Sequence, residues 1–216
     1  MNLPAWGHRF LAGWFGQGHH VSLRSNRVER QMHLTLNQTD KYLLWPSLNI
    51  RTRTRLEQFE WLKQSNHFER LLNLTLSLIH PGLFKCGLAM LQKLRASGLT
   101  MEIAKQWQSV YTGIAIISNQ ITPAHRDSKG KPEWFDLLMN YAGDKTQLKL
   151  LIHDLGLELN YSSGTVVGLC GTIFKHEVRA WGDGDQVCYA HFMREVVRKR
   201  LEAEDPGWVY QSMYLL

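Results

Sequence analysis

The chain has 216 residues, of which 44% are hydrophobic and 20% charged, a balance that excludes a disordered chain and fits a folded globular protein. Lysine and arginine exceed aspartate and glutamate by six, which is compatible with binding nucleic acid but does not require it. The three cysteines lie far apart, which argues against a disulfide framework or a cysteine zinc site and favours an intracellular, reducing compartment. No apolar run approaches the roughly 20 residues that a bilayer requires, so no contact with a membrane is expected.

The N-terminal half is predicted to be helical after an arm without regular structure. Residues 1–55 form a basic and aromatic arm that lacks firm periodicity. Residues 56–108 carry apolar side chains at helical spacing, which predicts a helical support region in one compact domain with residues 109–216. Three helices are expected there: one over 56–64, one that His80, Pro81 and Gly82 end, and one with Gly98 as its C-cap.

The second half, residues 109–216, is predicted to be a β-structure closed by a helix. Runs of β-branched and aromatic residues alternate with turn residues, which predicts strands over 109–117, 134–141, 147–152, 165–170, 172–181 and 186–193. A helix is expected over 194–203. Short strands with tight turns indicate an antiparallel sandwich or a jelly roll. The fold class is therefore α+β, with helices flanking the strands on both sides in the sequence.

A candidate metal site begins at His125 and Asp127, which are separated by one residue. On an extended chain their side chains point to the same face and can reach one ion. His176 is the best third ligand, because it is expected in mid-strand with an inward-facing imidazole. Two histidines and one carboxylate on one side of an ion leave open positions, as in the non-haem Fe(II) oxygenases.

The spacing alone is a weak signal. His67 and Glu69 have the same spacing by coincidence, on a predicted helix where it does not put them on one face. An inward-facing histidine is also more often a hydrogen-bonded core residue than a ligand. The surrounding sequence is what gives the three residues weight.

Three longer segments carry a family resemblance: SVYTGIAIISNQITPAHRDSKGKPEWFDLL at 109–138, YSSGTVVGLCGTIFKHEV at 161–178 and WGDGDQVCYAHFMREVV at 181–197. Together they resemble the catalytic core of the TET/JBP-type Fe(II)/2-oxoglutarate-dependent dioxygenases, particularly fungal members. The resemblance implies a double-stranded β-helix, which is a jelly roll, with Fe(II) held by His125, Asp127 and His176 as the catalytic centre. It implies 2-oxoglutarate and O₂ as co-substrates.

The resemblance also implies a reaction, a binding partner and a location in the cell. The expected activity is oxidation of a methyl group on a DNA base, either 5-methylcytosine, thymine or N6-methyladenine. Methylated DNA is the expected partner, with RNA, a protein side chain or a small molecule as alternative substrates. A monomer that works in the nucleus is expected.

The chain departs from the family at the co-substrate site. The family usually carries an arginine ten residues beyond the distal histidine, where this chain has Gln186, and Gln120 also stands where relatives have arginine. A neutral amide cannot neutralise the far carboxylate of 2-oxoglutarate. Three explanations stay open: weaker co-substrate binding, another cation such as Arg194 or Arg179, or loss of turnover. The last makes the chain a catalytically silent nucleic-acid-binding module on the same fold.

Three residues are assigned to the substrate side of the expected site. Asp136 interrupts an apolar run and could accept a hydrogen bond from the exocyclic amine of a flipped base. The alternative is a salt-bridge partner for a nearby lysine. Gly130 would leave room for the base, and Arg126 is grouped with these two in substrate binding.

Overall fold

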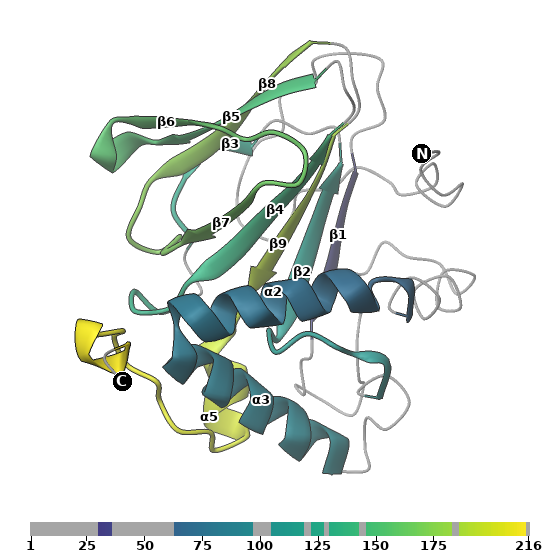
Figure 1. The fold of residues 1–216 in the computed structure, drawn as a ribbon, viewed down its shortest axis with the longest axis vertical. Coiled ribbons are helices and arrows are strands. Elements are labelled where there is room, and N and C mark those ends of the chain that lie inside the picture. Colours follow the sequence, from purple (N-terminus) through teal and green to yellow (C-terminus); the bar gives the residue numbers. More distant parts are fainter. Residues whose placement is uncertain are drawn as a thin grey trace.

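The computed structural model describes residues 30–35, 63–96, 105–118, 122–127, 130–142, 146–182 and 186–214. Nine strands in this part of the chain form two antiparallel sheets that face each other, with helices on the outer side of the larger sheet (Figure 1). The larger sheet has the strand order β1-β2-β9-β4-β7, and the smaller has the order β3-β8-β5-β6. This arrangement is the predicted α+β jelly roll.

The strands of the larger sheet come from distant parts of the sequence. They are β1 (Arg30–Thr35), β2 (Gly113–Ser118), β4 (Asp136–Ala142), β7 (Val166–Leu169) and β9 (Gln186–Phe192). The smaller sheet contains β3 (Thr122–His125), β5 (Thr146–Ile152), β6 (Leu157–Asn160) and β8 (His176–Gly182). Between β5 and β6 lies the short 3₁₀ helix η2 (His153–Leu155).

Two cores hold these layers together. One lies between the sheets, where side chains from β4, β5, β7 and β8 meet: Leu138, Leu148, Leu150, Ile152, Leu169 and Val178. The other lies between the larger sheet and two helices, α2 (Asn66–Ile79) and α3 (Pro81–Ala96). Leu72 and Leu76 of α2 pack there with Leu83 and Met90 of α3 and with Leu137 of β4. The larger sheet therefore has one face on the helices and the other on the smaller sheet.

The junction between α2 and α3 follows from two residues. Pro81 lacks a backbone N–H and disfavours helix at the residue before it, so α2 ends at Ile79 and Pro81 begins α3. His80 caps the new helix, since its Nδ1 accepts a hydrogen bond from the Leu83 backbone N–H at 3.2 Å. The chain ends with α5 (Glu195–Arg200) and the 3₁₀ helix η3 (Gln211–Met213).

Several predicted boundaries are wrong. The strand predicted over 172–181 begins only at His176, because Ile173 and Phe174 donate backbone hydrogen bonds to Cys170 and form a turn. The arm over 1–55 is not irregular throughout, since β1 pairs along the edge of β2. The short strands β3 and β6 were not predicted as strands. The helix expected over 56–64 lies largely outside the described residues, and the expected C-cap Gly98 lies wholly outside them.

Candidate metal centre

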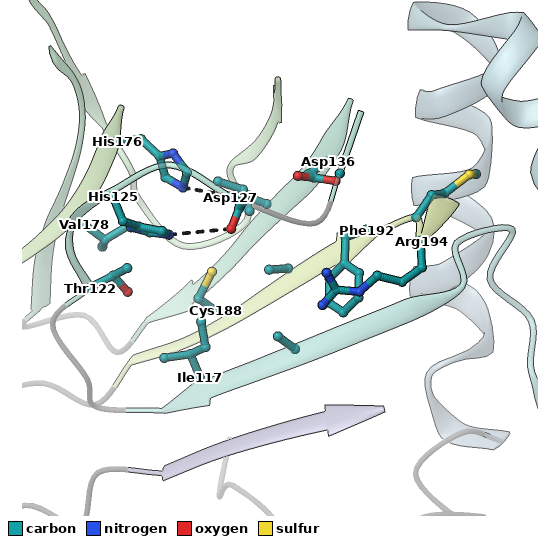
Figure 2. Close-up of a pocket in the computed structure, with 15 residues that line it drawn as sticks. Ile117, Thr122, His125, Asp127, Asp136, His176, Val178, Cys188, Phe192 and Arg194 are labelled. Atoms are coloured by element: carbon teal, nitrogen blue, oxygen red, sulfur yellow. Dashed lines mark ion pairs between the residues drawn. The ribbon is translucent and has the colours of Figure 1, made fainter. Parts of the chain in front are cut away.

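Strand pairing brings the three predicted ligands together. His125 ends β3 and pairs in register with His176, which begins β8, and their rings lie 4.3 Å apart. Asp127 follows two residues after His125. The ligand atoms of the three residues all lie within 4.8 Å of one another, and Figure 2 shows both imidazoles turned toward the carboxylate. His176 is thus the first residue of its strand, not a mid-strand residue, and it still faces the site.

Hydrogen bonds hold one ring nitrogen of each histidine to the backbone, and the other ring nitrogen faces Asp127. Nδ1 of His125 lies 2.8 Å from the Pro123 carbonyl oxygen, and Nδ1 of His176 lies 3.0 Å from that of Phe174. A carbonyl oxygen can only accept, so each Nδ1 carries the proton and each Nε2 keeps its lone pair. The Nε2 atoms face Asp127 at 3.8 and 3.9 Å. These distances exceed a hydrogen bond and leave space for an ion between the ligands.

The electrostatics of the site agree with metal ligation. Burial lowers the pKa of His125, and the neighbouring His176 lowers it further, so the neutral imidazole that a metal requires is favoured. Two neutral imidazoles and one carboxylate are donors that suit Fe(II). The orienting carbonyls behind both histidines are also typical of protein metal sites. The residues present therefore fit the iron that the sequence predicts.

Gly171 sets the position of Asp127. Its carbonyl oxygen accepts a hydrogen bond from the Asp127 backbone N–H at 2.9 Å. A Cβ atom at this position would lie 2.2 Å from Asp127 Oδ2 and 3.0 Å from Asp136 Oδ2. Only glycine allows the carboxylate to approach this closely. Sequence reasoning missed this residue, and the available signal was a glycine in the turn five residues before the distal histidine.

The three ligands open onto a cavity of about 80 Å³ between the two sheets. Its walls are largely apolar, with contributions from Ala115, Ile117, Leu138, Cys188, Ala190 and Phe192. The side chain of Cys188 faces this space (Figure 2). An enclosed apolar pocket with a few convergent polar groups is the usual form of a ligand site.

Asp136 and Arg194 are the charged groups that line the cavity beyond the metal ligands. Burial raises the pKa of Asp136 well above its ordinary value, Asp127 raises it further, and Arg194 opposes them. Burial therefore favours the protonated form of Asp136 more than it would in an exposed carboxyl. Arg194 lies over the Phe192 ring at 4.3 Å, and burial lowers its pKa against the pull of both aspartates. Among the described residues it is the one lysine or arginine in the cavity wall.

The other predicted site residues are distributed differently. Gly130 lines the cavity beside Thr172. Gln186 is buried at the start of β9 and does not line it. Arg126 points to Asp154 and the Ile173 carbonyl, outside the cavity wall, and Arg179 pairs with Glu177. Gln120 lies outside the described residues.

Comparisons with solved structures found similar chains, and the first of the three that follow supports the fold. A solved structure titled NgTET1 in complex with 5mC DNA is similar to this chain with a TM-score of 0.53 and 12% identity, covering 86% of this chain and 67% of that one. A cupin 2 conserved barrel protein from Salinispora arenicola matches with a TM-score of 0.30 and 16% identity, covering 42% of this chain and 69% of its own. An RmlC-like cupin from Desulfovibrio desulfuricans matches with a TM-score of 0.27 and 16% identity, covering 36% and 71%.

Three further findings concern curated relatives, membrane-spanning helices and the family. No curated protein matches the chain. In the described part of the chain, no helix has both the length and the apolar character to cross a membrane. The family described as the oxygenase domain of the 2OGFeDO superfamily, Tet_JBP, matches residues 46–195, which is more than half of the chain. The chain therefore belongs to the Tet_JBP family of 2-oxoglutarate and Fe(II)-dependent dioxygenase domains.

Proposed function

We propose that this protein is an Fe(II)/2-oxoglutarate-dependent dioxygenase that oxidises a methyl group on a modified DNA base. The observation that carries this proposal is the pair of carbonyl-oriented histidines facing one carboxylate at an apolar cavity. Membership of the oxygenase family supports the same chemistry. Candidate substrates are 5-methylcytosine, thymine and N6-methyladenine, and the similar NgTET1 structure holds 5mC DNA.

His125, Asp127 and His176 would hold the iron. When bound, iron with 2-oxoglutarate and O₂ supplies the oxidation, in which the co-substrate leaves as succinate and CO₂ and one oxygen atom enters a methyl C–H bond. The protein contributes two neutral nitrogens and one anionic oxygen. This ligand set leaves a divalent ion with net positive charge, which attracts an anionic co-substrate. The apolar walls limit the access of water to the same space.

We assign the far carboxylate of the co-substrate to Arg194. A guanidinium can bind a carboxylate through two hydrogen bonds, and this one lines the metal-facing cavity. By strand alternation, Gln186 lies on the same face of β9 as Cys188 and Phe192. It stands at the first residue of the strand, whereas Arg194 follows the last. A co-substrate held by Arg194 would therefore extend from the iron in a different direction from one held near Gln186 and Gln120.

Asp136 and Gly130 are proposed to contact the substrate. The carboxyl of Asp136 can accept a hydrogen bond from an exocyclic amine, and its protonated form, which burial favours, can donate one to a ring nitrogen or carbonyl of a base. Gly130 keeps the wall beside Thr172 free of a side chain. The excess of six positive charges supports binding to the phosphates of DNA. A protein that acts on DNA in this way would work in the nucleus, and we propose that it does so as a monomer.

The proposal is tested in two steps. First, Fe(II) and 2-oxoglutarate are added to the protein without oxygen, and the visible metal-to-ligand charge-transfer band is followed. The control is Asp127→Ala, which lacks one of the three metal ligands. Second, duplexes that carry each methylated base are incubated aerobically, and succinate and oxidised base are measured by mass spectrometry. A saturating band with oxidised base is the expected result. A charge-transfer band without oxidation of any DNA base would contradict the proposal that the substrate is a methylated DNA base. Methylated RNA is then tested as the alternative substrate.

The position of Gln186 favours a second candidate, a catalytically silent nucleic-acid-binding module. The expected co-substrate arginine is absent, and the amide in its place lies outside the cavity wall. A silent module binds duplex DNA and can bind iron, but forms no charge-transfer band and releases no succinate. In such a module Gln186→Arg leaves DNA binding unchanged and the protein inert, whereas in a weakened enzyme it raises turnover.

A further inference from the structure

Asp154 lies in η2, outside the cavity, and contacts both chain segments that carry the metal ligands. Its Oδ1 accepts a hydrogen bond from Arg126 Nη2 at 2.7 Å. Its Oδ2 accepts one from the Lys175 backbone N–H at 2.5 Å. Arg126 stands between His125 and Asp127, and Lys175 directly precedes His176. One carboxylate therefore joins the segment of the first two ligands to the segment of the third.

Other bonds reinforce this connection. Arg126 Nε donates to the Ile173 carbonyl oxygen at 2.8 Å, which ties the first segment directly to the turn before β8. The backbone N–H of His153 donates to the Lys175 carbonyl oxygen at 2.8 Å, which fixes η2 against that turn. These contacts involve no cavity-lining side chain. They place Arg126 and Asp154 behind the ligands, on the side away from the substrate.

We infer that Arg126 and Asp154 form a positioning pair that sets the separation of the ligand-bearing segments before metal binds. The inference rests on the metal site of the proposed function and gives Arg126 a role other than substrate contact. The two side chains are 49% and 36% exposed, and ion pairs this exposed contribute little to global stability. Metal affinity, in contrast, depends closely on how ligands are oriented by the groups behind them.

The test compares metal affinity with stability in variants of the full chain. Asp154→Ala removes both hydrogen bonds, and Glu158→Ala is the matched control, because Glu158 is a nearby exposed carboxylate that pairs with Lys149 and contacts neither ligand segment. Co(II) affinity is measured from its visible absorption under anaerobic conditions, and the melting temperature is measured without metal. We expect Asp154→Ala to weaken Co(II) binding about 10- to 100-fold. Its melting temperature should stay near that of the wild type.

A double-mutant cycle sharpens the result. If the two residues act as one unit, the double variant with Arg126→Ala and Asp154→Ala binds Co(II) no more weakly than the single variant with the larger loss of affinity. Wild-type affinity in Asp154→Ala would overturn the inference and leave the proposed metal site standing. A loss of affinity matched by the Glu158→Ala control would also overturn it. A wild-type protein that binds neither Co(II) nor Fe(II) would overturn both the inference and the proposed function.

Discussion

Gly171 and Arg194 show how single residues limit the chemistry of the candidate site. The first allows a carboxylate to lie against the backbone, and the second supplies the positive charge in the cavity wall. The three candidate ligands could be selected from the sequence, because the His125 and Asp127 spacing and the surrounding motifs point to them, and the structure brings them together. The contact between Gly171 and Asp127 was not predictable, since it depends on how a turn before β8 meets the end of β3.

Gly171→Ala should weaken metal binding about tenfold or more while the protein still folds. The added Cβ would lie 2.2 Å from Asp127 Oδ2, so the ligand must move. Gly130→Ala is the control, because its Cβ would meet only the Thr172 hydroxyl at 2.9 Å, which can rotate away. Co(II) titration of both variants makes the comparison. Equal affinities would show that Asp127 adjusts freely and that Gly171 is not required.

Arg194→Met should raise the dissociation constant for 2-oxoglutarate about 10- to 100-fold, as expected for a hydrogen bond to a charged group worth about 1.5–3 kcal/mol. Iron binding should be unchanged, because Arg194 is not among the ligands. Gln186→Ala is measured in parallel by the charge-transfer band. A larger loss in Gln186→Ala than in Arg194→Met would place the co-substrate at the opposite end of β9 and contradict the assignment.

Among the elements, the helices were easier to predict than the strand ends. The spacing of Leu72 and Leu76 and the break at Pro81 define α2 locally. The strand β6 was missed because it has only four residues and lies at a sheet edge, where most of its side chains are exposed. The β-branched residues Thr172 and Ile173 favour a strand by propensity, but the local backbone hydrogen bonds that Ile173 and Phe174 donate to Cys170 turn the chain there.

His80 links helix capping to pH. It is fully buried, its Nε2 donates to the Glu133 carbonyl oxygen at 3.0 Å and its Nδ1 accepts from Leu83, so both ring nitrogens are engaged in the neutral form. Burial is the main cause of its lowered pKa, opposed by the bond to Glu133. The unfolded chain therefore takes up the proton first, at about pH 6.5. Stability should fall as the pH drops below that value.

His80→Asn tests this expectation, because asparagine can still cap α3 but does not titrate. We expect its melting temperature to fall less than that of the wild type between pH 7.5 and 5.5. His67→Asn is the control, since His67 is an exposed residue of the neighbouring helix. The prediction fails if His80→Asn and the wild type lose stability in parallel over this range.

At the scale of the molecule, the candidate metal site joins segments that are distant in sequence, so a metal bound there would be coupled to folding. The jelly roll was predictable from the run of short strands, whereas the pairing of β1 with β2 and the order of strands in each sheet were not. These features depend on contacts between residues far apart in the chain, which local patterns do not encode.

Metal should therefore stabilise the whole protein. At a free concentration 100 times the dissociation constant, binding adds about 2.7 kcal/mol to the free energy of unfolding. In a chain of this size that raises the melting temperature by roughly 5–10 °C. Differential scanning fluorimetry with Co(II) or anaerobic Fe(II) measures the shift, and a chelator should reverse it. His176→Ala should show no shift, and an equal shift in that variant would mean that the metal binds elsewhere.

The strand β9 has two faces with separate tasks. Cys188, Ala190 and Phe192 face the cavity, whereas His191, between two of them in sequence, packs behind and pairs with Glu69 of α2 at 3.0 Å. Mutations on one face can therefore accumulate without loosening the helices that rest on the other. Related proteins could therefore differ in the ligand that the cavity binds and still keep the same packing between β9 and the helices.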